Sequence, residues 1–505
     1  MSYINPRHAS LYLASLPLLV TMLTFAGCGD DGDPGLDPSD RDSGVSMPSD
    51  GAVAPDSADL EGGADGGADA EAEDGGMPPV DAGGVCGRDF HNLYDLAGYA
   101  DFTSVTELPS GDLVVVGTAE GFGSGGSDGV VVRFAPDGTH RWSRSVGTST
   151  TDELLAVADD GAGGVIVAGR TIYDRLNSDG LLARLDADGD TVFSRVISPP
   201  VMSFTHQRFE LHAALPLGGD ETLIVGVDTS QSSTSPGASP SSSGFAAVVD
   251  GAGAILRQRT IRDNNMGFFD AIRLSDGDIL VSGAGPGRAL ALRLNASDLT
   301  VRWRSTFPGD YFTSAIELPG GDLVLGGVYV ETRFTTDFSH WFLARATRDG
   351  EAVWIRQLEL EDSVLQGLVI HDGKIVASGE VSAADSLDAH VAVLDFDGFI
   401  VREFPYAIAT DDWFSAATTT ADGSLVMAGG AIVSSYAHGR LVRYAGAFDD
   451  CGLESRFSSM SLPTVATSEA GDFGTESAHS SESFEGLGVA NGPSMPTVAA
   501  LACGM

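Results

Sequence analysis

The chain repeats one strand-like phrase seven times, and this repetition constrains its fold more than any other feature of the sequence. Each copy is a short run of small and β-branched apolar residues that ends in glycine, as in GDLVVVG and GGVIVAG, and consecutive copies lie 44 to 57 residues apart. The closing glycines of repeats 1 to 7 are Gly117, Gly169, Gly226, Gly283, Gly327, Gly379 and Gly429. A period in this range indicates a solenoid, a propeller or an array of similar units.

Each repeat has room for four short strands. The glycine-ended run follows a run rich in Ala, Ser and Gly, such as FTSVTEL from Phe102, and precedes an alternating run such as VVVRF. In most repeats a fourth run follows a turn such as PDG or ADG. Alternation bounded by Gly and Asp indicates strands joined by hairpins. Four strands in each repeat of about 50 residues predict an all-β fold, a β-propeller.

The segment from Ser127 to Thr171 resembles the bacterial propeller repeat called SBBP. It has the Asp before the third strand, the DG turn, the Trp in the fourth strand and the Gly that closes the second. The likeness extends over residues 88–450, although repeat 4 has a shortened loop between its second and third strands and repeat 6 lacks the Trp. This family is defined by its architecture, so the resemblance implies a fold and no single activity.

Repeat 7, which begins near Trp413, has only three strand-like runs. The stretch FHNLYDLAG, from Phe90 to Gly98, precedes repeat 1 and has the pattern of a fourth strand. Pairing of this strand with the last repeat would close the ring and remove its exposed edges. We therefore predict a seven-bladed β-propeller over residues 88–451, with the N-terminal strand completing the last blade.

Two cysteines flank this predicted seam. Cys86 lies just before the N-terminal strand and Cys451 just after the last strand of repeat 7, which predicts a disulfide between them. It would close a loop of 451 − 86 + 1 = 366 residues, and a loop of that length corresponds to at most about 5 kcal/mol of stabilisation. A bridge between Cys451 and Cys503 remains the alternative.

The N-terminus has the pattern of an export signal. Residues 1–27 combine Arg7, an uncharged apolar run and small residues at the end. The stretch Phe25-Ala26-Gly27-Cys28 resembles the bacterial lipobox, although that family usually has Leu where Phe25 stands. The resemblance implies acylation of Cys28, including palmitate, and a lipid anchor in the bacterial cell envelope, expected at the outer membrane. An ordinary secretory signal with an incidental cysteine is the alternative.

Two segments beside the propeller lack apolar periodicity. Residues 28–87 are rich in Asp, Gly, Ala and Pro, and residues 452–505 are rich in Ser, Gly, Ala and Glu. Such compositions bury too little surface to offset the entropy of ordering, so we predict a disordered tether and a disordered tail. The net charge of −43 argues against a nucleic-acid partner and against an electrostatic hold on anionic lipid.

The catalytic motifs that match this sequence lack their structural context. Glycines in the dinucleotide pattern (121–126) and a serine in the nucleophile-elbow pattern (125–129) lie between two predicted strands, and no helix follows either. His340 and His438 stand where other repeats have Asp128, Asp179 and Asp388, and we interpret them as polar residues that cap turns. We therefore predict no catalytic residue and no cofactor.

Three tryptophans, Trp142, Trp303 and Trp354, share the fourth-strand position. Quinone-dependent dehydrogenases also carry a Trp in each propeller blade, but their resemblance would demand charged and metal-binding residues along the channel. The residues expected at one level of the innermost strands are small and mostly neutral: Ser104, Ala156, Ala213, Asp270, Ser314, Gln366 and Ala416. We therefore expect the tryptophans to pack adjacent blades together.

Acidic residues recur where the fourth strand of one repeat passes to the first strand of the next. They are Asp101, Asp152, Glu153, Asp310, Glu361, Asp362, Asp411 and Asp412. Carboxylates that converge on one opening focus negative potential, and their oxygens suit a hard cation such as calcium. We predict that a ligand binds on this face. The alternative is that these residues only cap turns and keep the surface solvated.

The sequence favours a membrane-anchored binding module for an unknown protein or glycan. Two alternatives stay open. One is a scaffold for envelope assembly, similar to the propeller lipoprotein of the outer-membrane barrel-assembly machinery. The other is an enzyme, either quinone-dependent or active on polysaccharides.

Overall fold

The computed structural model describes most of the predicted propeller. The described residues are 90–446, apart from 97–98, 122, 124–125, 199–203, 233–240, 264, 335, 359, 383–385, 407–408 and 434–435, together with three short strands after residue 446. The predicted signal, the predicted tether and all four cysteines, Cys28, Cys86, Cys451 and Cys503, lie outside them. In the described part of the chain, no helix has the length and apolar character that a membrane crossing requires.

The all-β prediction is confirmed for the described residues, in which every regular element is a strand. Repeats 1 and 2 contain β2 (Ala100–Glu107), β3 (Leu113–Glu120), β4 (Ser127–Phe134), β5 (His140–Val146), β6 (Thr151–Asp159), β7 (Val165–Asp174), β8 (Asn177–Leu185) and β9 (Thr191–Ser198). Repeats 3 and 4 contain β10 (Phe204–Gly218), β11 (Glu221–Ser232), β12 (Ser241–Val249), β13 (Ile255–Arg262), β14 (Gly267–Arg273), β15 (Ile279–Gly285), β16 (Arg288–Leu294) and β17 (Val301–Phe307). Repeats 5 and 6 contain β18 (Tyr311–Glu317), β19 (Leu323–Arg333), β20 (Thr336–Ala346), β21 (Ala352–Gln357), β22 (Ser363–His371), β23 (Lys374–Ser382), β24 (Leu387–Leu394) and β25 (Ile400–Pro405). Repeat 7 contains β26 (Asp412–Thr419), β27 (Leu425–Val433) and β28 (Tyr436–Tyr444), and β28 pairs with β1 (Phe90–Asp95).

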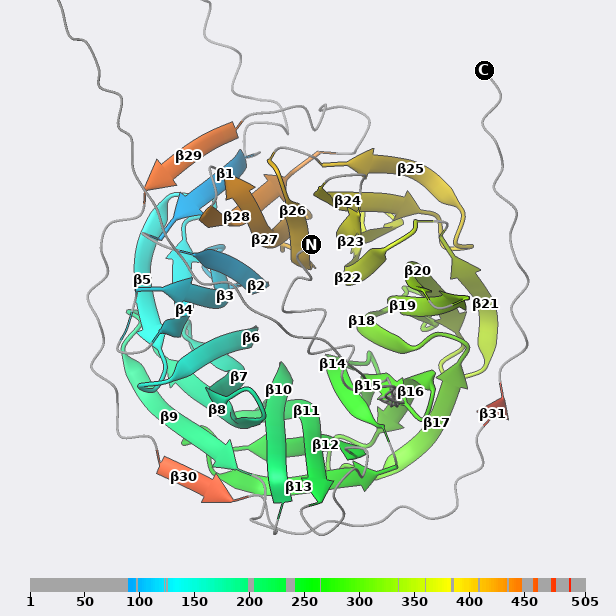
Figure 1. The fold of residues 1–505 in the computed structure, drawn as a ribbon, viewed down its shortest axis with the longest axis horizontal. Helices are drawn as coiled ribbons and strands as arrows, with labels where there is room; N and C mark the ends of the chain where they lie inside the picture. The colour runs from blue at the N-terminus through cyan, green and yellow to red at the C-terminus, as the bar shows by residue number, and fades with distance from the viewer. Residues whose placement is uncertain are drawn as a thin grey trace, which may run out of the picture. The chain divides into compact units, whose positions relative to one another are not determined.

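The strands of each repeat pair antiparallel in chain order. Figure 1 shows the repeats following one another around a central axis, with the first strand of each repeat innermost and the fourth outermost. The sheets of repeats 2 and 3 are also joined by two residue pairs between β8 and β10. This arrangement is a β-propeller.

A β-bulge in each first strand explains the repeated glycine. In repeat 1, Phe102 pairs with Gly117 and the next pair begins at Ser104, so Thr103 is left out of the ladder. A Cβ atom on Gly117 would lie 1.8 Å from the backbone oxygen of Asp101. At the other six closing glycines the corresponding distance is 1.9 to 2.1 Å. The bulge brings two backbones so close that only glycine fits.

An arginine on the third strand joins its own repeat to the next one in five of the seven repeats. In repeat 1 the Nε of Arg133 donates to Asp112 Oδ2 at 2.8 Å, and its Nη1 donates to the carbonyl oxygen of Ala187, in repeat 2, at 2.7 Å. The equivalent residues are Arg184, Arg293, Arg345 and Arg443. Charged donors make these hydrogen bonds stronger than neutral ones.

The fourth-strand tryptophans make the same junctions. The indole Nε1 of Trp142 donates to the carbonyl oxygen of Ala187 at 3.2 Å, the same oxygen that accepts from the third-strand arginine. Trp303 and Trp354 make the equivalent bonds to the following repeats at 3.0 and 3.1 Å. The prediction that the tryptophans pack adjacent repeats together is confirmed.

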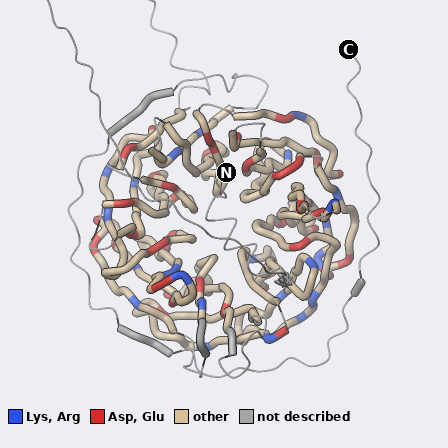
Figure 2. The backbone as a smooth tube through the Cα atoms, in the orientation of Figure 1, with Lys and Arg blue, Asp and Glu red and all other residues tan. Residues whose placement is uncertain are grey.

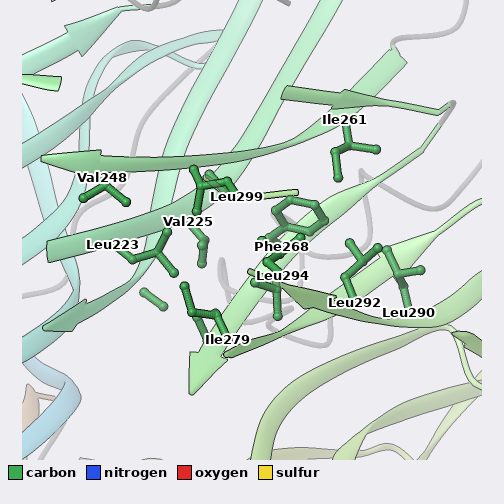
Figure 3. Packing of buried hydrophobic residues seen from close by; sticks show 14 of the residues in the cluster. Leu223, Val225, Val248, Ile261, Phe268, Ile279, Leu290, Leu292, Leu294 and Leu299 are labelled. Atoms are coloured by element: carbon green, nitrogen blue, oxygen red, sulfur yellow. The ribbon is translucent and has the colours of Figure 1, made fainter. Parts of the chain in front are cut away.

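The hydrophobic core is divided into clusters that lie between neighbouring repeats. In the cluster of Figure 3, Leu223, Val225 and Val248 of repeat 3 pack against Phe268 and Ile279 of repeat 4. Each of these five side chains is fully shielded from solvent. Since burial of one such side chain contributes about 1.5–3 kcal/mol, packing between repeats is a major source of stability.

Strand β1 lies beside the third strand of repeat 7. It pairs antiparallel with β28, and Phe90 lies opposite Arg443. In repeat 1, Trp142 lies opposite Arg133 in the same way. Phe90 thus stands where other repeats have their tryptophan, and its ring lies beside Gly138 in the turn of repeat 1.

Three short strands from the segment predicted as a disordered tail add to outer edges in parallel. Strand β29 (Phe457–Ser461) pairs with β1, β30 (Gly474–Ser477) with β9, and β31 (Ala490–Asn491) with β17. The outermost strand of a blade has an edge of unpaired backbone groups, which can accept a further strand irrespective of its composition. Composition alone therefore did not indicate these pairings.

Candidate functional site: the crossing face

Strand direction defines two faces. Because the four strands of a repeat alternate in direction, the fourth-to-first connections and the hairpins between second and third strands emerge on one side, here called the crossing face. The turns between first and second and between third and fourth strands emerge on the other side, the turn face. All eight acidic residues of the predicted ligand face belong to the crossing face.

Three of these residues, Asp152, Asp310 and Asp412, share one position at the start of a first strand, and each accepts a backbone N–H. Asp152 accepts from Thr148 N at 2.7 Å, Asp310 from Val330 N at 2.6 Å, and Asp412 from Ala409 N at 2.9 Å. Asp152 and Asp412 are fully buried. Burial raises the pKa of Asp152 and of Asp310. Asp152 and Asp412 thus cap the connections that precede their strands, whereas Asp310 binds the second strand of its own repeat.

Three more of the acidic residues have partners within the fold. Asp101 Oδ1 accepts the indole N–H of Trp413 at 2.9 Å. Glu153 Oε2 accepts from Arg170 Nε at 2.8 Å, and Asp411 Oδ1 accepts from the backbone N–H of Leu387 at 2.8 Å. The contacts of Asp101 and Asp411 join neighbouring repeats, whereas that of Glu153 lies within repeat 2.

Only Glu361 and Asp362 are exposed members of the predicted set. Glu361 accepts from Arg333 Nη1 at 2.6 Å. Asp362 has a backbone φ of 50°. The expectation of eight carboxylates converging on the opening is thus corrected, because most of them turn toward backbone and side-chain donors of the fold. The capping alternative describes the four that accept a backbone N–H, and the other two, Asp101 and Glu153, bind side-chain donors.

Charge on the described residues is dispersed. Figure 2 shows Asp and Glu in every part of the ring, with arginines between them. No group of three or more His, Cys, Asp or Glu side chains in the described ranges is placed to hold a metal ion. The geometry therefore offers no preformed calcium cage in this part of the chain.

A partly buried charge cluster joins repeats 2 and 3 on the crossing face. Arg170 on β7 lies between Glu153 and Glu210, and its Nη1 is 2.5 Å from Glu210 Oε1. His212 Nε2 lies 3.3 Å from the other oxygen of Glu210. Burial alone would raise the pKa of Glu210, but the charge of Arg170 and the bond to His212 hold that pKa well below its usual range. The sequence signal was a charged residue at the end of VIVAGR, where five of the other repeats have small or apolar residues and repeat 6 has Glu380.

The innermost strands expose little chemistry to the central opening. Asp270 accepts the backbone N–H groups of Ala271 and Ala315, both at 2.8 Å, and burial raises its pKa to about 6. Ser314 accepts similarly from Leu368 N at 3.1 Å. We expected Gln366 at the same level of the innermost strands as Asp270 and Ser314. It does not lie there, because Gln366 is the bulged residue of its strand.

The histidines expected to cap turns lie within strands. His340 is in β20 opposite Tyr329, and His438 is in β28 opposite Ala431. The correction follows from the length of β20, which has 11 residues and begins four residues before His340. His340 is buried and its ring stacks on Tyr329 at 6.4 Å.

One comparison with known families agrees with the fold. A family model described as a domain of unknown function (DUF5122) β-propeller matches residues 108–139. No curated protein sequence matches the chain. Similar solved structures include the WD40 β-propeller domain of Doa1, with 14% identity and a TM-score of 0.42 over 70% of this chain and 96% of that one. The hydrazine synthase of Kuenenia stuttgartiensis has 12% identity and a TM-score of 0.45 over 68% of this chain and 96% of its own. Puromycin hydrolase has 15% identity and a TM-score of 0.43 over 69% of this chain and 54% of its own. Likeness at this level indicates no activity.

Proposed function

We propose that this protein is an exported, lipid-anchored β-propeller that binds a macromolecular ligand on its crossing face. The propeller has seven blades, and β1 completes the last of them. Cys28 carries the lipid, and the acidic segment after it holds the propeller away from the outer membrane. The protein acts by binding and needs no cofactor.

The difference between the two faces carries the proposal. On the turn face, third-strand arginines and fourth-strand tryptophans make the same contacts from repeat to repeat. On the crossing face the hairpins differ: β10 and β11 have 15 and 12 residues, β19 and β20 have 11 each, and β15 and β16 have 7 each. Loops that vary on a uniform scaffold are where binding residues concentrate.

The proposed closure rests on two contacts of repeat 7. Strand β1 pairs with β28 in the register of a fourth strand. Arg443 Nη1 donates to the carbonyl oxygen of Pro136, in repeat 1, at 2.8 Å, which is the contact that Arg133 makes to repeat 2. Because Phe90 lies opposite Arg443, the same pairing favours a Cys86–Cys451 disulfide, which peptide mapping of the unreduced protein tests.

Photo-crosslinking on intact cells tests the binding face. A photoreactive residue is placed at Asp362 on the crossing face or at Asp188 on the turn face, two exposed aspartates. We expect adducts from position 362 and none from position 188. Equal adducts, or adducts from position 188 alone, would contradict the proposal. Separately, Cys28→Ser should move the protein from the membrane fraction to the soluble fraction.

A further inference from the structure

Phe334, at the tip of the β19–β20 hairpin, combines two unfavourable features. Its exposed fraction is 103%, the largest among the exposed large apolar residues of the described chain. Its backbone φ is 58°, in the left-handed region that bulky side chains rarely adopt. Arg333 pairs with Thr336, so Phe334 is the first residue of a two-residue turn. Glycine, Asn and Asp are the residues that usually fill such turns.

The same chain shows how these features are usually offset. Leu299 has a φ of 57°, almost the same as Phe334, but it is 1% exposed and packs in the cluster between repeats 3 and 4. Two other left-handed turn residues, Gly219 and Asp372, are small or polar. Phe334 has neither burial nor a suitable residue type. Such an outlier on a surface loop points to a role outside this chain.

Side-chain contacts brace the hairpin strands below Phe334. The guanidinium of Arg333 lies 5.1 Å from the ring centre of Phe338 and pairs with Glu331 at 2.8 Å and with Glu361 of the next repeat at 2.6 Å. Thr332 Oγ1 donates to Asp337 Oδ1 at 2.7 Å. Bracing of this kind reduces the entropy that a contact would otherwise lose.

We propose that Phe334 is a binding anchor that inserts into an apolar pocket of a partner protein, a proposal that rests on the crossing face being the binding face. An exposed aromatic residue on a rigid support is the usual form of an interface hot spot. The carboxylates of Glu331, Glu361 and Asp362 outnumber Arg333 around the tip, so the rim of the partner's pocket should be basic.

A protein fits this site better than a glycan. Sugar recognition needs hydrogen-bond donors and acceptors beside the aromatic ring, but the nearby Arg333 is engaged by Glu331 and Glu361. Two more aromatic residues, Tyr173 and Tyr436, stand 50% and 64% exposed at hairpins of repeats 2 and 7 on the same face. Only a large partner could contact hairpins on several repeats at once.

The test uses the full chain in its own cells, with benzoylphenylalanine at position 334, 362 or 399. Phe399 is the matched control, because it is 57% exposed but lies on the turn face. We expect a protein adduct at position 334, identified by mass spectrometry. The purified partner should then bind Phe334→Gly at least about 30-fold more weakly than the unchanged chain, the range of a hot-spot residue. Binding to Phe399→Gly should change less than about twofold, as for residues outside an interface.

Stability separates an anchor from a structural residue. Glycine adopts a φ of 58° without strain, so Phe334→Gly should melt at the same temperature as the unchanged chain or higher. A lower Tm, or unchanged partner affinity, would overturn the anchor. A protein adduct at 362 without one at 334 would overturn the anchor and leave the binding face standing, whereas adducts at 399 alone would overturn both. A glycan or lipid adduct at 334 would overturn the protein partner.

Discussion

Repeats 1 and 7 differ at the third-strand position opposite the closing glycine. In repeat 1 this residue is Val130, which packs in an apolar cluster. In repeat 7 it is Arg440, also fully buried. Arg440 Nη1 donates to Asp412 Oδ1 at 3.2 Å and its Nε donates to His91 Nε2, on β1, at 3.1 Å. Burial lowers the pKa of Arg440 to about 10, although Asp412 opposes this shift.

The difference follows from how each sheet receives its fourth strand. In repeat 1 the fourth strand follows the third through a short turn, so the connection sets the register. In repeat 7, β28 pairs instead with β1, which comes from the other end of the repeat array, so no connecting turn sets the register of this pair. Apolar contacts tolerate a shifted register more readily than directional bonds do, so a buried polar network can specify the pairing.

Among these variants, substitution of Arg440 should lower the free energy of unfolding most. We expect Arg440→Leu to lower the free energy of unfolding by about 3–5 kcal/mol, because Asp412 is left buried without its charged partner. Val130→Ala in repeat 1, which only deletes methyl groups, should cost about 1–2 kcal/mol. Urea unfolding measures both, and a smaller loss for Arg440→Leu than for Val130→Ala would contradict this account.

A double variant sharpens the same point. Arg440→Leu combined with Asp412→Leu removes both charges, and we expect it to recover part of the lost stability. If the polar network sets the register of β1, the backbone amides of residues 90–95 in the double variant should exchange with deuterium faster than in the unchanged protein, even where stability is recovered. Unchanged exchange there would show that apolar packing suffices.

Equivalent arginines test whether the two junctions are alike. Arg133→Leu and Arg443→Leu each remove a carboxylate bond and the bonding to the next repeat, which is two bonds for Arg133 and one for Arg443. We expect each to lower the free energy of unfolding by about 2 kcal/mol, the range for hydrogen bonds to charged groups. Only Arg443→Leu should also speed deuterium exchange in β1. Equal exchange in the two variants would contradict a special role for the seam.

The seam should also be sensitive to acid. Burial and the charge of Arg440 lower the pKa of His91 from 6.5 to about 3. The unfolded state therefore binds a proton that the folded state does not between these values, and stability falls as the pH falls below 6.5. At pH 5.5 we expect a loss of about 1.4 kcal/mol relative to pH 8. His91→Gln should abolish this part of the pH dependence in thermal melts.

In repeat 4, the contribution of Asp270 to stability should depend on pH more weakly than that of His91 and with the opposite sign. Burial raises the pKa of Asp270 from 3.8 to about 6, so the folded state binds the extra proton and this group favours folding less as the pH rises from 4 to 6. Asp270→Asn should slightly raise the Tm at pH 7 and leave the Tm at pH 4 nearly unchanged. A fall in Tm at pH 7 would contradict this prediction.

The sequence predicted features that depend on strand period and repetition. The glycine spacing indicated the four-stranded repeats, and the shared place of Trp142, Trp303 and Trp354 indicated contacts between neighbours. The arginine junctions could have been found in the same way, since Arg recurs in VVVRF, LLARL, LALRL and RLVRY.

What could not be predicted depends on which way a side chain turns. Asp152 and Asp362 both belong to acidic connections, yet one is fully buried and the other exposed. Gln366 was placed one residue out of register because a bulge breaks the period of two without a mark in the sequence. The exposure of Phe334 depends on a hairpin length that the strand pattern did not reveal.

The position of strand β1 in the chain also affects when its pairing with β28 can form. It is the first strand of the ring to be synthesised, and its partner β28 follows some 350 residues later, which takes roughly 20 to 70 s at ordinary rates of synthesis. Throughout that interval no lasting partner for β1 exists, and contacts between residues so distant in sequence form slowly. The β1–β28 pair can therefore form only after the chain between these strands has been made.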